Sequence, residues 1–521
     1  MFWNAGVQVR FLNASPNNMK KLFLPLLAVL AFAQLVSAQN NVEVFDNYVE
    51  AARKEWNVPG LSIVVVQDGK PILSKGYGVR ELGKNEPVDA ETLFGAMSTT
   101  KAMTAVTMGM LVDEGKVSWD DKVTKHLPDF RVADPYVTSE LKIRDLFTHN
   151  AGLGNADFLW GWTPDLPASE IMRRMQYAKP AYSFRGGYTY QNIMYLVAGQ
   201  VIEKISGMPW ERFVTDRLFV PLGMKNTFAN YKLSEAYQNR SKAHYDVDGK
   251  MIVIPESLAD PIAPAGSVWS TSDDIAKWVN FMLGNTTVNG KQLLKPATFQ
   301  AILRPQIVVP PGQFYPTVAL TKPHWTTYGY GWFQHDYRGE MVNFHTGSLA
   351  GRTAIIGMIP DKKLGVYIFG NVDHAEVRHA LMYKAFDVFG FGDNTRDWSK
   401  EMKTLYDGLE AAAKKQSDAV RARRNPNTKP NLPLRSYAGK YSDPFYGQME
   451  VKFDNDKLRL IMGKDRSADL EHWHFDTFVT KWSEPWRGEG RVSFQTNPNT
   501  GEVETLNIGG ASLRRVPSSS Q

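Results

Sequence analysis

Strand-like segments stand at both ends of a long helical stretch, and this order constrains the fold more than any other feature. Residues 61–73 read as two short apolar strands around an Asp68-Gly69 turn. Residues 98–300 are mainly helical in pattern, and short apolar strands return over residues 328–369. Because strands at both ends need partners, we expect one sheet with the helices inserted between them. The predicted class is α/β, with one core over residues 40–395.

Individual elements follow from periodicity and from their stop signals. Helices are predicted over residues 99–114, ended by Gly115, and over residues 192–205, ended by Gly207. A helix-like opening precedes them at residues 42–56. The later strands are predicted over four ranges, namely 328–333, 341–345, 353–359 and 364–369.

A second, smaller domain follows a linker. Residues 396–433 hold a polar helix rich in Ala, Lys and Arg, and then an Asn- and Pro-rich stretch typical of a linker. Residues 434–521 alternate apolar and polar side chains around turns at Asn455-Asp456 and at residues 499–501. This pattern predicts a small antiparallel sandwich or barrel.

The N-terminus has the pattern of a secretory signal peptide. Lys20 and Lys21 open a run over residues 22–36 that is apolar except for Gln34, and small residues end it at position 38. The alternative, a membrane anchor, is disfavoured because the run is shorter than the roughly 20 residues that a spanning helix needs. We expect residues 1–38 to be a signal peptide with an upstream extension, and the protein to be periplasmic or secreted. The sequence leaves open whether translation starts at Met1 or Met19.

Composition excludes several classes of protein. Removal of residues 1–38 deletes three basic residues and no acid, so the net charge falls from +6 to +3, and no nucleic-acid footprint remains. The chain has no Cys, which excludes a disulfide framework, thiolate metal sites and a Cys nucleophile. His472 and His474 alternate on a predicted strand without further ligands. We therefore expect no metal, no cofactor and no stable membrane span.

Ser-x-x-Lys occurs twice, and context separates the two copies. Ser98 opens an apolar helix, so its backbone N–H and the helix dipole face a developing anion, and Lys101 follows one turn later on the same face. A lysine can take the proton of a serine hydroxyl if desolvation lowers its pKa. Ser139, with Lys142, lies on a polar stretch without such a setting. The alternative is that Ser98 only caps the helix and that Lys101 is solvated.

Two further segments carry side chains suited to proton transfer and substrate binding. Tyr190-Gln191-Asn192 stands directly before an apolar helix, where a phenol can relay a proton and an amide can orient a lysine. His345-Thr346-Gly347-Ser348 ends a predicted strand. Taken alone, each is a weak signal, because a strand-end His is usually structural and Tyr-Gln-Asn recurs at residues 237–239.

Together, in this order, the three motifs give a chain that resembles the serine penicillin-recognising family. This family includes class C β-lactamases, DD-peptidases, and esterases and aminopeptidases on the same fold. Connecting segments over residues 143–153, 264–274 and 328–332 also look like the family, and the resemblance covers about residues 42–390. It implies a β-lactamase/transpeptidase-like fold, with an antiparallel sheet flanked by helices and an all-helical subdomain. The tail looks like a small β domain often appended to such hydrolases.

The resemblance also implies roles for individual residues. Ser98 would be acylated, while Lys101 and Tyr190 handle its proton; which of the two is the base stays open. Asn192 would bind the substrate amide and hold Lys101. The N–H groups of Ser98 and Ser348 would form the oxyanion hole. The remaining substrate-binding residues would be His345 and Thr346, which face the leaving group or a substrate carboxylate, with Gly347 beside them.

Two departures from the family pattern affect the expected substrate. Gln191 replaces the usual small residue, and His345 stands where many β-lactamases carry Lys, which weakens the case for an anionic β-lactam. We expect a serine hydrolase (EC 3.4.16 or 3.5.2 type) of peptide amides such as D-residue-containing stem peptides. The alternatives are an esterase, a weak class C-like β-lactamase, a penicillin-acylated sensor and a non-catalytic scaffold. The C-terminal domain is a candidate surface for homo-oligomer formation.

Overall fold

The computed structural model describes residues 40–163, 165–464 and 466–517. The predicted signal peptide therefore lies outside the described residues. Residues 40–55 form a helix, and all of the architecture below lies after it. Within the described part of the chain, no helix is long and apolar enough to cross a membrane.

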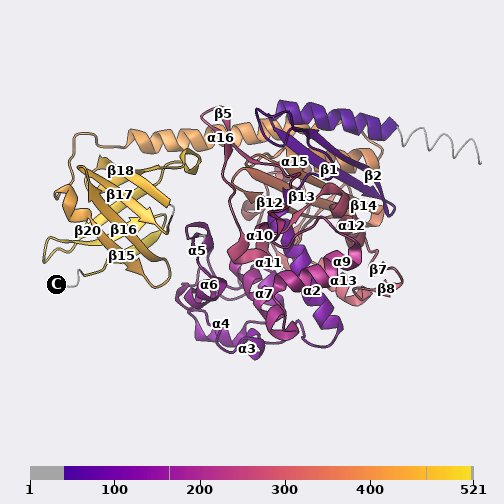
Figure 1. The fold of residues 1–521 in the computed structure, drawn as a ribbon, viewed down its shortest axis with the longest axis horizontal. Helices are drawn as coiled ribbons and strands as arrows, with labels where there is room; N and C mark the ends of the chain where they lie inside the picture. The colour runs from indigo at the N-terminus through magenta and orange to yellow at the C-terminus, as the bar shows by residue number, and fades with distance from the viewer. Residues whose placement is uncertain (1–39, 164, 465, 518–521) are drawn as a thin grey trace, which may run out of the picture. The chain divides into compact units, whose positions relative to one another are not determined.

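The strands predicted before and after the helical stretch meet in one sheet, as the sequence predicts. Strands β1 (Gly60–Gln67) and β2 (Lys70–Gly78) form a hairpin whose turn, Asp68-Gly69, has φ angles of 48° and 81°. This is the backbone that a two-residue type I′ turn requires. Strand β1 then pairs with β14 (Leu364–Gly370), almost 300 residues later. In Figure 1 the indigo hairpin lies beside the later strands of the sheet.

All neighbouring strands of this sheet are antiparallel, in the order β2-β1-β14-β13-β12-β11-β10-β9. The remaining strands are β9 (Ile307–Val308), β10 (Thr326–Tyr328), β11 (Phe333–Tyr337), β12 (Glu340–Leu349) and β13 (Arg352–Ile359). Two-stranded ribbons are formed by β3 (Phe94–Gly95) with β6 (Trp269–Ser270), β4 (Ala243–Val247) with β5 (Lys250–Ile254), and β7 (Thr287–Val288) with β8 (Lys291–Gln292).

One predicted strand is wrong. Residues 328–333 are not a single strand: Tyr328 ends β10, Phe333 begins β11, and residues 329–332 form the turn between them. Gly331, at φ 84°, packs against helix α2 (Thr100–Asp113). An added Cβ there would be 2.8 Å from the backbone N of Ala102. Packing of this turn against the buried helix, rather than local strand propensity, decides its structure.

Helix α2 (Thr100–Asp113) is the centre of the helical region. Every residue from Thr100 to Leu111 is buried, so the helix has no solvent-facing side over three turns. It ends before Gly115, which has φ 71°. Helix α7 (Asn192–Ser206) packs against it and ends at Gly207, with φ 72°. Both helices match the predicted ranges within one or two residues.

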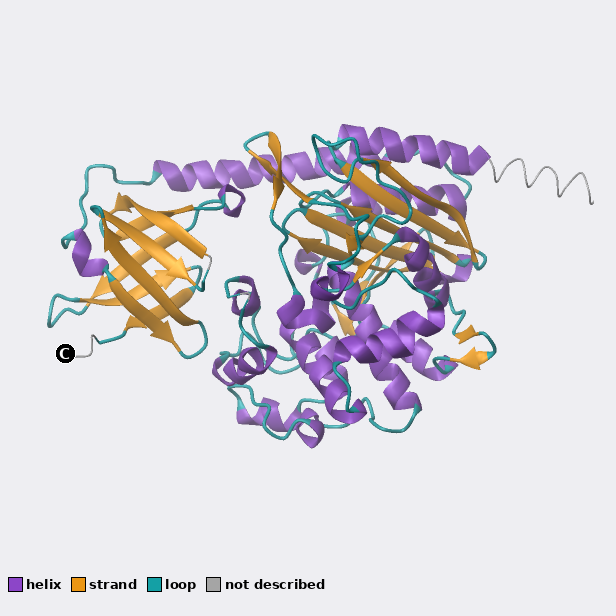
Figure 2. Ribbon diagram, in the orientation of Figure 1, coloured by secondary structure: helices purple, strands orange, loops and turns teal. Residues whose placement is uncertain are grey.

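The chain has further helices, and Figure 2 shows several of them packed around the large sheet. Helix α12 (Ser272–Met282) packs on β1 and β14, and α15 (Val377–Ala385) packs on β13 and β14. The helices are α3 (Val123–His126), α4 (Pro135–Glu140), α5 (Phe158–Gly161), α6 (Ala168–Arg174), α8 (Trp210–Val214), α9 (Val220–Leu222), α10 (Tyr231–Ser234), α11 (Ala263–Gly266), α12 (Ser272–Met282), α13 (Pro296–Leu303), α14 (Val318–Thr321), α15 (Val377–Ala385) and α16 (Trp398–Ala422).

The C-terminal domain is a closed barrel, which decides between the two predicted architectures. Its last strand pairs with its first, through Tyr441 with Arg515 and Ser442 with Arg514, so the sheet has no free edge. It has its own apolar core. The strands are β15 (Gly439–Asp443), β16 (Gly447–Asp454), β17 (Lys457–Met462), β18 (Arg466–His474), β19 (Thr477–Trp482), β20 (Arg491–Thr496), β21 (Val503–Ile508) and β22 (Ala511–Arg515).

Candidate active site

Ser98 lies in a single 3₁₀ turn, η1 (Met97–Thr99), directly before α2. Met97 has a left-handed φ of 45°, a strained conformation for a residue with a side chain. Met97 and Thr99 are buried, whereas Ser98 between them is half-buried and lines a cavity. The turn therefore presents one hydroxyl at the N-terminus of a buried helix, as the sequence predicts.

Lys101 lies one turn later and is completely buried. Its Nζ donates to Ser98 Oγ at 3.1 Å, to Asn192 Oδ1 at 2.6 Å and to the carbonyl of Ala265 at 2.8 Å. Burial lowers the pKa of Lys101 to about 7, and the carboxylate of Asp157 opposes this shift. A neutral amine is thus accessible near neutral pH, as a general base requires.

Tyr190 is the second side chain that contacts the Ser98 hydroxyl. Its phenol hydrogen-bonds with Ser98, and burial raises the pKa of Tyr190 well above its usual range. The Lys101 Nζ lies 4.8 Å from the centre of the Tyr190 ring. In this environment the phenol keeps its proton at neutral pH, so Tyr190 is placed to pass protons rather than to hold a lasting negative charge.

The structure brings the three predicted motifs together because β12 runs close to η1. An added Cβ at Gly347 would lie 2.5 Å from the carbonyl oxygen of Ala96 and 3.1 Å from the backbone N of Ser98. No side chain fits in this space, which explains the glycine. Thr346 and Ser348, on either side of it, line the cavity with Ser98.

His345 is placed differently from the other predicted residues. It is 1% exposed and is not among the residues that line the cavity. Its Nδ1 bonds to the carbonyl of Thr346 at 2.6 Å, and its Nε2 bonds to the hydroxyl of Tyr328 at 3.0 Å. Burial lowers the pKa of His345 to about 3, so the ring is uncharged. Its contact with a leaving group or a carboxylate stays a prediction.

A second histidine, which the sequence analysis did not identify, positions the Tyr190 segment. The His149 carbonyl accepts from the Thr189 N–H at 2.9 Å, and its Nδ1 accepts from the Gln191 N–H at 3.0 Å. The ring lies 4.4 Å from that of Tyr190, centre to centre. His149 has a left-handed φ of 61° and is buried, and burial lowers its pKa well below the usual range. Nothing in the local sequence indicates this role, because the contact joins segments 40 residues apart.

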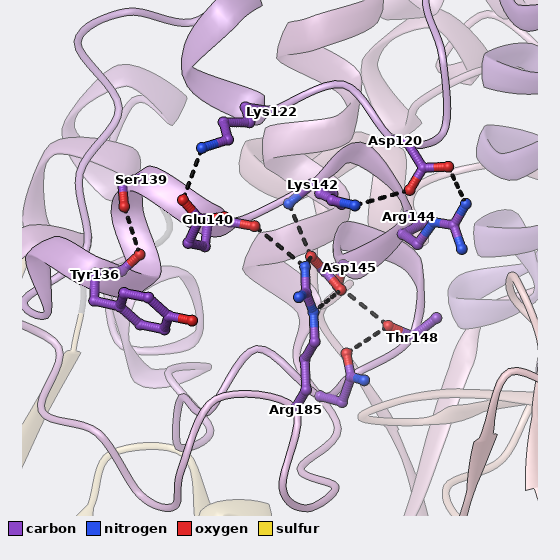
Figure 3. A network of polar contacts seen from close by, with 11 residues as sticks. Asp120, Lys122, Tyr136, Ser139, Glu140, Lys142, Arg144, Asp145, Thr148 and Arg185 are labelled. Atoms are coloured by element: carbon purple, nitrogen blue, oxygen red, sulfur yellow. Dashed lines mark hydrogen bonds and ion pairs between the residues drawn. The ribbon is translucent and has the colours of Figure 1, made fainter.

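The second Ser-x-x-Lys copy forms no such pair, as Figure 3 shows. Ser139 donates to the carbonyl of Tyr136, and Lys142 pairs with Asp120 at 3.0 Å. Arg185 holds the buried Asp145 with two hydrogen bonds, of 3.0 and 2.6 Å. The second copy thus belongs to an exposed ionic network, in agreement with its polar context.

The cavity at Ser98 has a volume of about 400 Å³, and six of its nineteen lining residues are aromatic. Among the described residues, Asp157 is the one charged side chain that lines it. Tyr315 reaches across from the loop before α14 and hydrogen-bonds with Thr346. The lining is formed by Met97, Ser98, Asp157, Trp160, Tyr188, Tyr190, Asn192, Ala259, Ile262, Ala265, Gly266, Gln313, Phe314, Tyr315, Pro316, Phe333, Thr346, Ser348 and Leu349.

Metal ligands do not gather in the described part of the chain. No group of three or more His, Asp or Glu side chains there could hold a metal ion. His472 lies in β18, as the sequence predicts for a strand there, and its Nε2 bonds to the carbonyl of Phe475.

Comparisons with known proteins agree with this geometry. The family model described as Beta-lactamase matches residues 45–387, and a model described as a domain of unknown function, DUF3471, matches residues 423–514. The chain is 28% identical over 449 residues to unguisins hydrolase ungD′ of Aspergillus campestris, which covers 81% of this chain and 80% of that protein. It is 24% identical to protein flp of Staphylococcus aureus, over 63% of this chain and 62% of that one.

Solved structures share the fold. The octameric penicillin-binding protein homologue from Pyrococcus abyssi superimposes with a TM-score of 0.58 at 23% identity, covering 91% of this chain and 99% of that chain. SurE gives a TM-score of 0.54 at 20% identity, covering 92% and 100%. Since the Beta-lactamase model covers well over half of the sequence, and since Lys101 and Tyr190 both bond to Ser98, which lines a cavity, the chain belongs to the beta-lactamase family of serine hydrolases, with a DUF3471 domain at its C-terminus.

Proposed function

We propose that this protein hydrolyses peptide amides, including those with D-residues, through an acyl-Ser98 intermediate with Lys101 as the general base. The observation that carries the proposal is the buried Lys101 amine, 3.1 Å from Ser98 Oγ and with a pKa of about 7. A permanently charged lysine could not take the serine proton, whereas this one is partly neutral at physiological pH.

Acylation uses these groups in order. The lone pair of neutral Lys101 takes the Ser98 hydroxyl proton as Oγ forms a bond to the substrate carbonyl carbon. The carbonyl π electrons move to oxygen, where the N–H groups of Ser98 and Ser348 would stabilise the oxyanion. The C–N bond then breaks, and the leaving nitrogen receives a proton from Lys101 through the Tyr190 hydroxyl.

Deacylation repeats the same steps with water. A water molecule gives a proton to the Lys101–Tyr190 pair and attacks the acyl carbon, and the Ser98 Oγ leaves with that proton. The acid product dissociates and the hydroxyl of Ser98 is restored. Every proton taken is thus returned, and the cycle needs no oxidant or co-reactant.

A peptide substrate is supported by the relatives as well as by the site. Two similar proteins are named unguisins hydrolases, and a solved structure with the same fold contains SurE with D-Leu. His345 is uncharged where many β-lactamases carry Lys, which disfavours an anionic β-lactam as the physiological substrate. Ester hydrolysis is the second candidate, because an ester is a more reactive acyl donor for the same nucleophile.

The experiment is intact-mass spectrometry of the protein with a fluorescent penicillin and, separately, with a p-nitrophenyl ester, alongside Ser98→Ala. We expect a one-to-one adduct that is absent in the variant and decays within the turnover time of the ester. An adduct that persists for hours with every donor would favour a penicillin sensor. No adduct and no turnover with either probe would contradict the proposed function.

Two expectations from the sequence remain proposals about the whole protein. We propose that residues 1–38 direct it to the periplasm or the medium, which N-terminal sequencing of the mature protein would test. We also propose a homo-oligomer that uses the C-terminal barrel. Light scattering of the full chain and of a chain ending at residue 395 would test this, with a smaller assembly expected from the shorter chain.

A further inference from the structure

The substrate cavity carries a single charge, and that charge is negative. Asp157 lies at the start of α5 and is half-buried in the cavity wall. Among the described residues, no Lys or Arg side chain lines the cavity. Lys101 lies behind the wall, with all three of its donors directed at protein acceptors. An anionic donor would therefore meet a carboxylate in the lining and no lining Lys or Arg to compensate its charge.

Arg378, which bonds to the strand of Ser348, already has partners within the protein. Arg378 is 4% exposed, donates to the Gly347 carbonyl at 2.7 Å and to Ser348 Oγ at 2.8 Å, and pairs with Glu376 at 2.9 Å. Its charge is thus neutralised inside the protein. It holds the strand that carries Ser348 rather than offering a binding site for a substrate carboxylate.

Asp157 itself has the capacity to accept another hydrogen bond. Its Oδ1 accepts from Asn192 Nδ2 at 2.9 Å and from Trp160 Nε1 at 3.0 Å, while Oδ2 accepts from the exposed Asn155 at 3.0 Å. A carboxylate can accept about four hydrogen bonds. The protein therefore holds the carboxylate firmly by Oδ1 and leaves Oδ2 capacity for a donor from the cavity.

Asp157 and the nucleophile Ser98 line the same cavity, which has a volume of about 400 Å³. Three successive hydrogen bonds join them, from Asp157 Oδ1 to Asn192, from Asn192 to Lys101, and from Lys101 to Ser98 Oγ. An α-amino nitrogen is two covalent bonds from the carbonyl carbon that Ser98 attacks. For a donor whose carbonyl lies at Ser98, Asp157 is thus the carboxylate of the lining that its α-amino group can meet.

We propose that Asp157 is a subsite for the protonated α-amino group of the acyl donor, so that the enzyme prefers peptides with a free N-terminus and an apolar or aromatic first residue. This rests on the proposed function and names its substrate class. The cleaved bond is then the first peptide bond of the chain. Donors that carry a carboxylate on this side, such as N-succinyl peptides, are selected against.

The test compares kcat/KM for phenylalanine p-nitroanilide with a free, an N-acetylated and an N-succinylated amino group, each as the D and the L enantiomer. We expect the free amine to exceed the acetylated donor at least tenfold at pH 7, and the succinylated donor to be the poorest. In Asp157→Asn the preference should fall to within threefold. Dividing each rate by that for p-nitrophenyl acetate, which has no amino group, removes any effect of the variant on Lys101.

Two controls separate the outcomes. Asp273→Asn removes an exposed carboxylate that bonds to Ser74, away from the cavity, and should keep the wild-type preference.

Calorimetry of the same anilides with Ser98→Ala measures binding at the subsite without catalysis, and we expect at least tenfold tighter binding of the free amine. Equal binding of free and acetylated donors there would overturn the subsite. Failure to acylate Ser98 with p-nitrophenyl acetate would instead overturn the proposed function.

Discussion

Lys101 Nζ lies 3.1 Å from Ser98 Oγ, at the end of a lysine side chain that has no solvent exposure. Burial removes the water that would stabilise the ammonium, and the same burial brings the amine to the hydroxyl. The polar partners that replace water are Asn192 and the carbonyl of Ala265. One packing arrangement thus sets both the position and the basicity of the base.

The first prediction concerns pH. Because the pKa of Lys101 is lowered to about 7, the neutral fraction grows as pH rises through that value. The acylation rate should therefore rise about tenfold per pH unit below 7 and level off above 8. His345, with a pKa of about 3, does not titrate in this window. The arginine of Lys101→Arg stays charged, so the acylation rate of this variant should fall roughly 10²–10⁴-fold. Stopped-flow acylation by a p-nitrophenyl ester measures both, and a flat profile from pH 5 to 8 would refute the assignment.

The second prediction moves that profile. Asn192→Asp places a carboxylate where the Asn192 amide oxygen now lies, 2.6 Å from Lys101 Nζ. A neighbouring negative charge favours the ammonium, so the midpoint of the profile should shift to higher pH by about 1–3 units. At pH 7 the variant should then be slower, and part of the loss should return at pH 9. Asn285→Asp adds the same charge at an exposed position and should leave the midpoint in place.

The third prediction concerns His149 as a positioning residue. His149→Ala removes the ring beside Tyr190 and the acceptor of the Gln191 N–H. Misplacing Tyr190 should lower kcat by about 10–100-fold with a smaller change in KM. Asn tolerates a left-handed backbone and offers an acceptor, so His149→Asn should recover part of kcat. If activity instead follows thermal stability in both variants, without rescue by Asn, the contact is merely structural.

The fourth prediction concerns Gly347. An alanine there would bring its Cβ to 2.5 Å from a backbone oxygen, so β12 and η1 must separate. We expect Gly347→Ala to lower the free energy of unfolding by about 1–3 kcal/mol and to lower kcat with it. Gly408, in the middle of α16, has open space around it, so Gly408→Ala should stabilise by about 0.5–1 kcal/mol without changing kcat. Urea unfolding and ester turnover measure both variants, and wild-type activity of Gly347→Ala would contradict the close approach.

Local signals predict the elements of this fold better than its long-range contacts. The hairpin at Asp68-Gly69 and the ends of α2 and α7 follow from glycine at defined backbone positions, which a sequence displays directly. Residues 328–333 read as a strand because they are aromatic and apolar. The packing of Gly331 on α2 makes them a turn, and no local pattern reports that packing.

The site residues likewise fall into those that local motifs indicate and those that only long-range contacts reveal. Ser98, Lys101, Tyr190 and Asn192 were predicted because each belongs to a motif at the start of an apolar helix. Asp157 and His149 stand in loops, and their roles come from contacts with Asn192 and Tyr190, which only the folded chain brings near. The C-terminal domain is likewise a closed barrel rather than a sandwich because β15 pairs with β22, and these strands stand at opposite ends of the domain's sequence.

The most direct test of the central claim is a time-resolved intact mass of the mature protein mixed with a p-nitrophenyl ester, run beside Ser98→Ala. The account predicts one acyl group per chain, located on Ser98, formed faster at pH 8 than at pH 6 and lost as product appears. An adduct of equal size in Ser98→Ala, or turnover unaffected by that substitution, would contradict it.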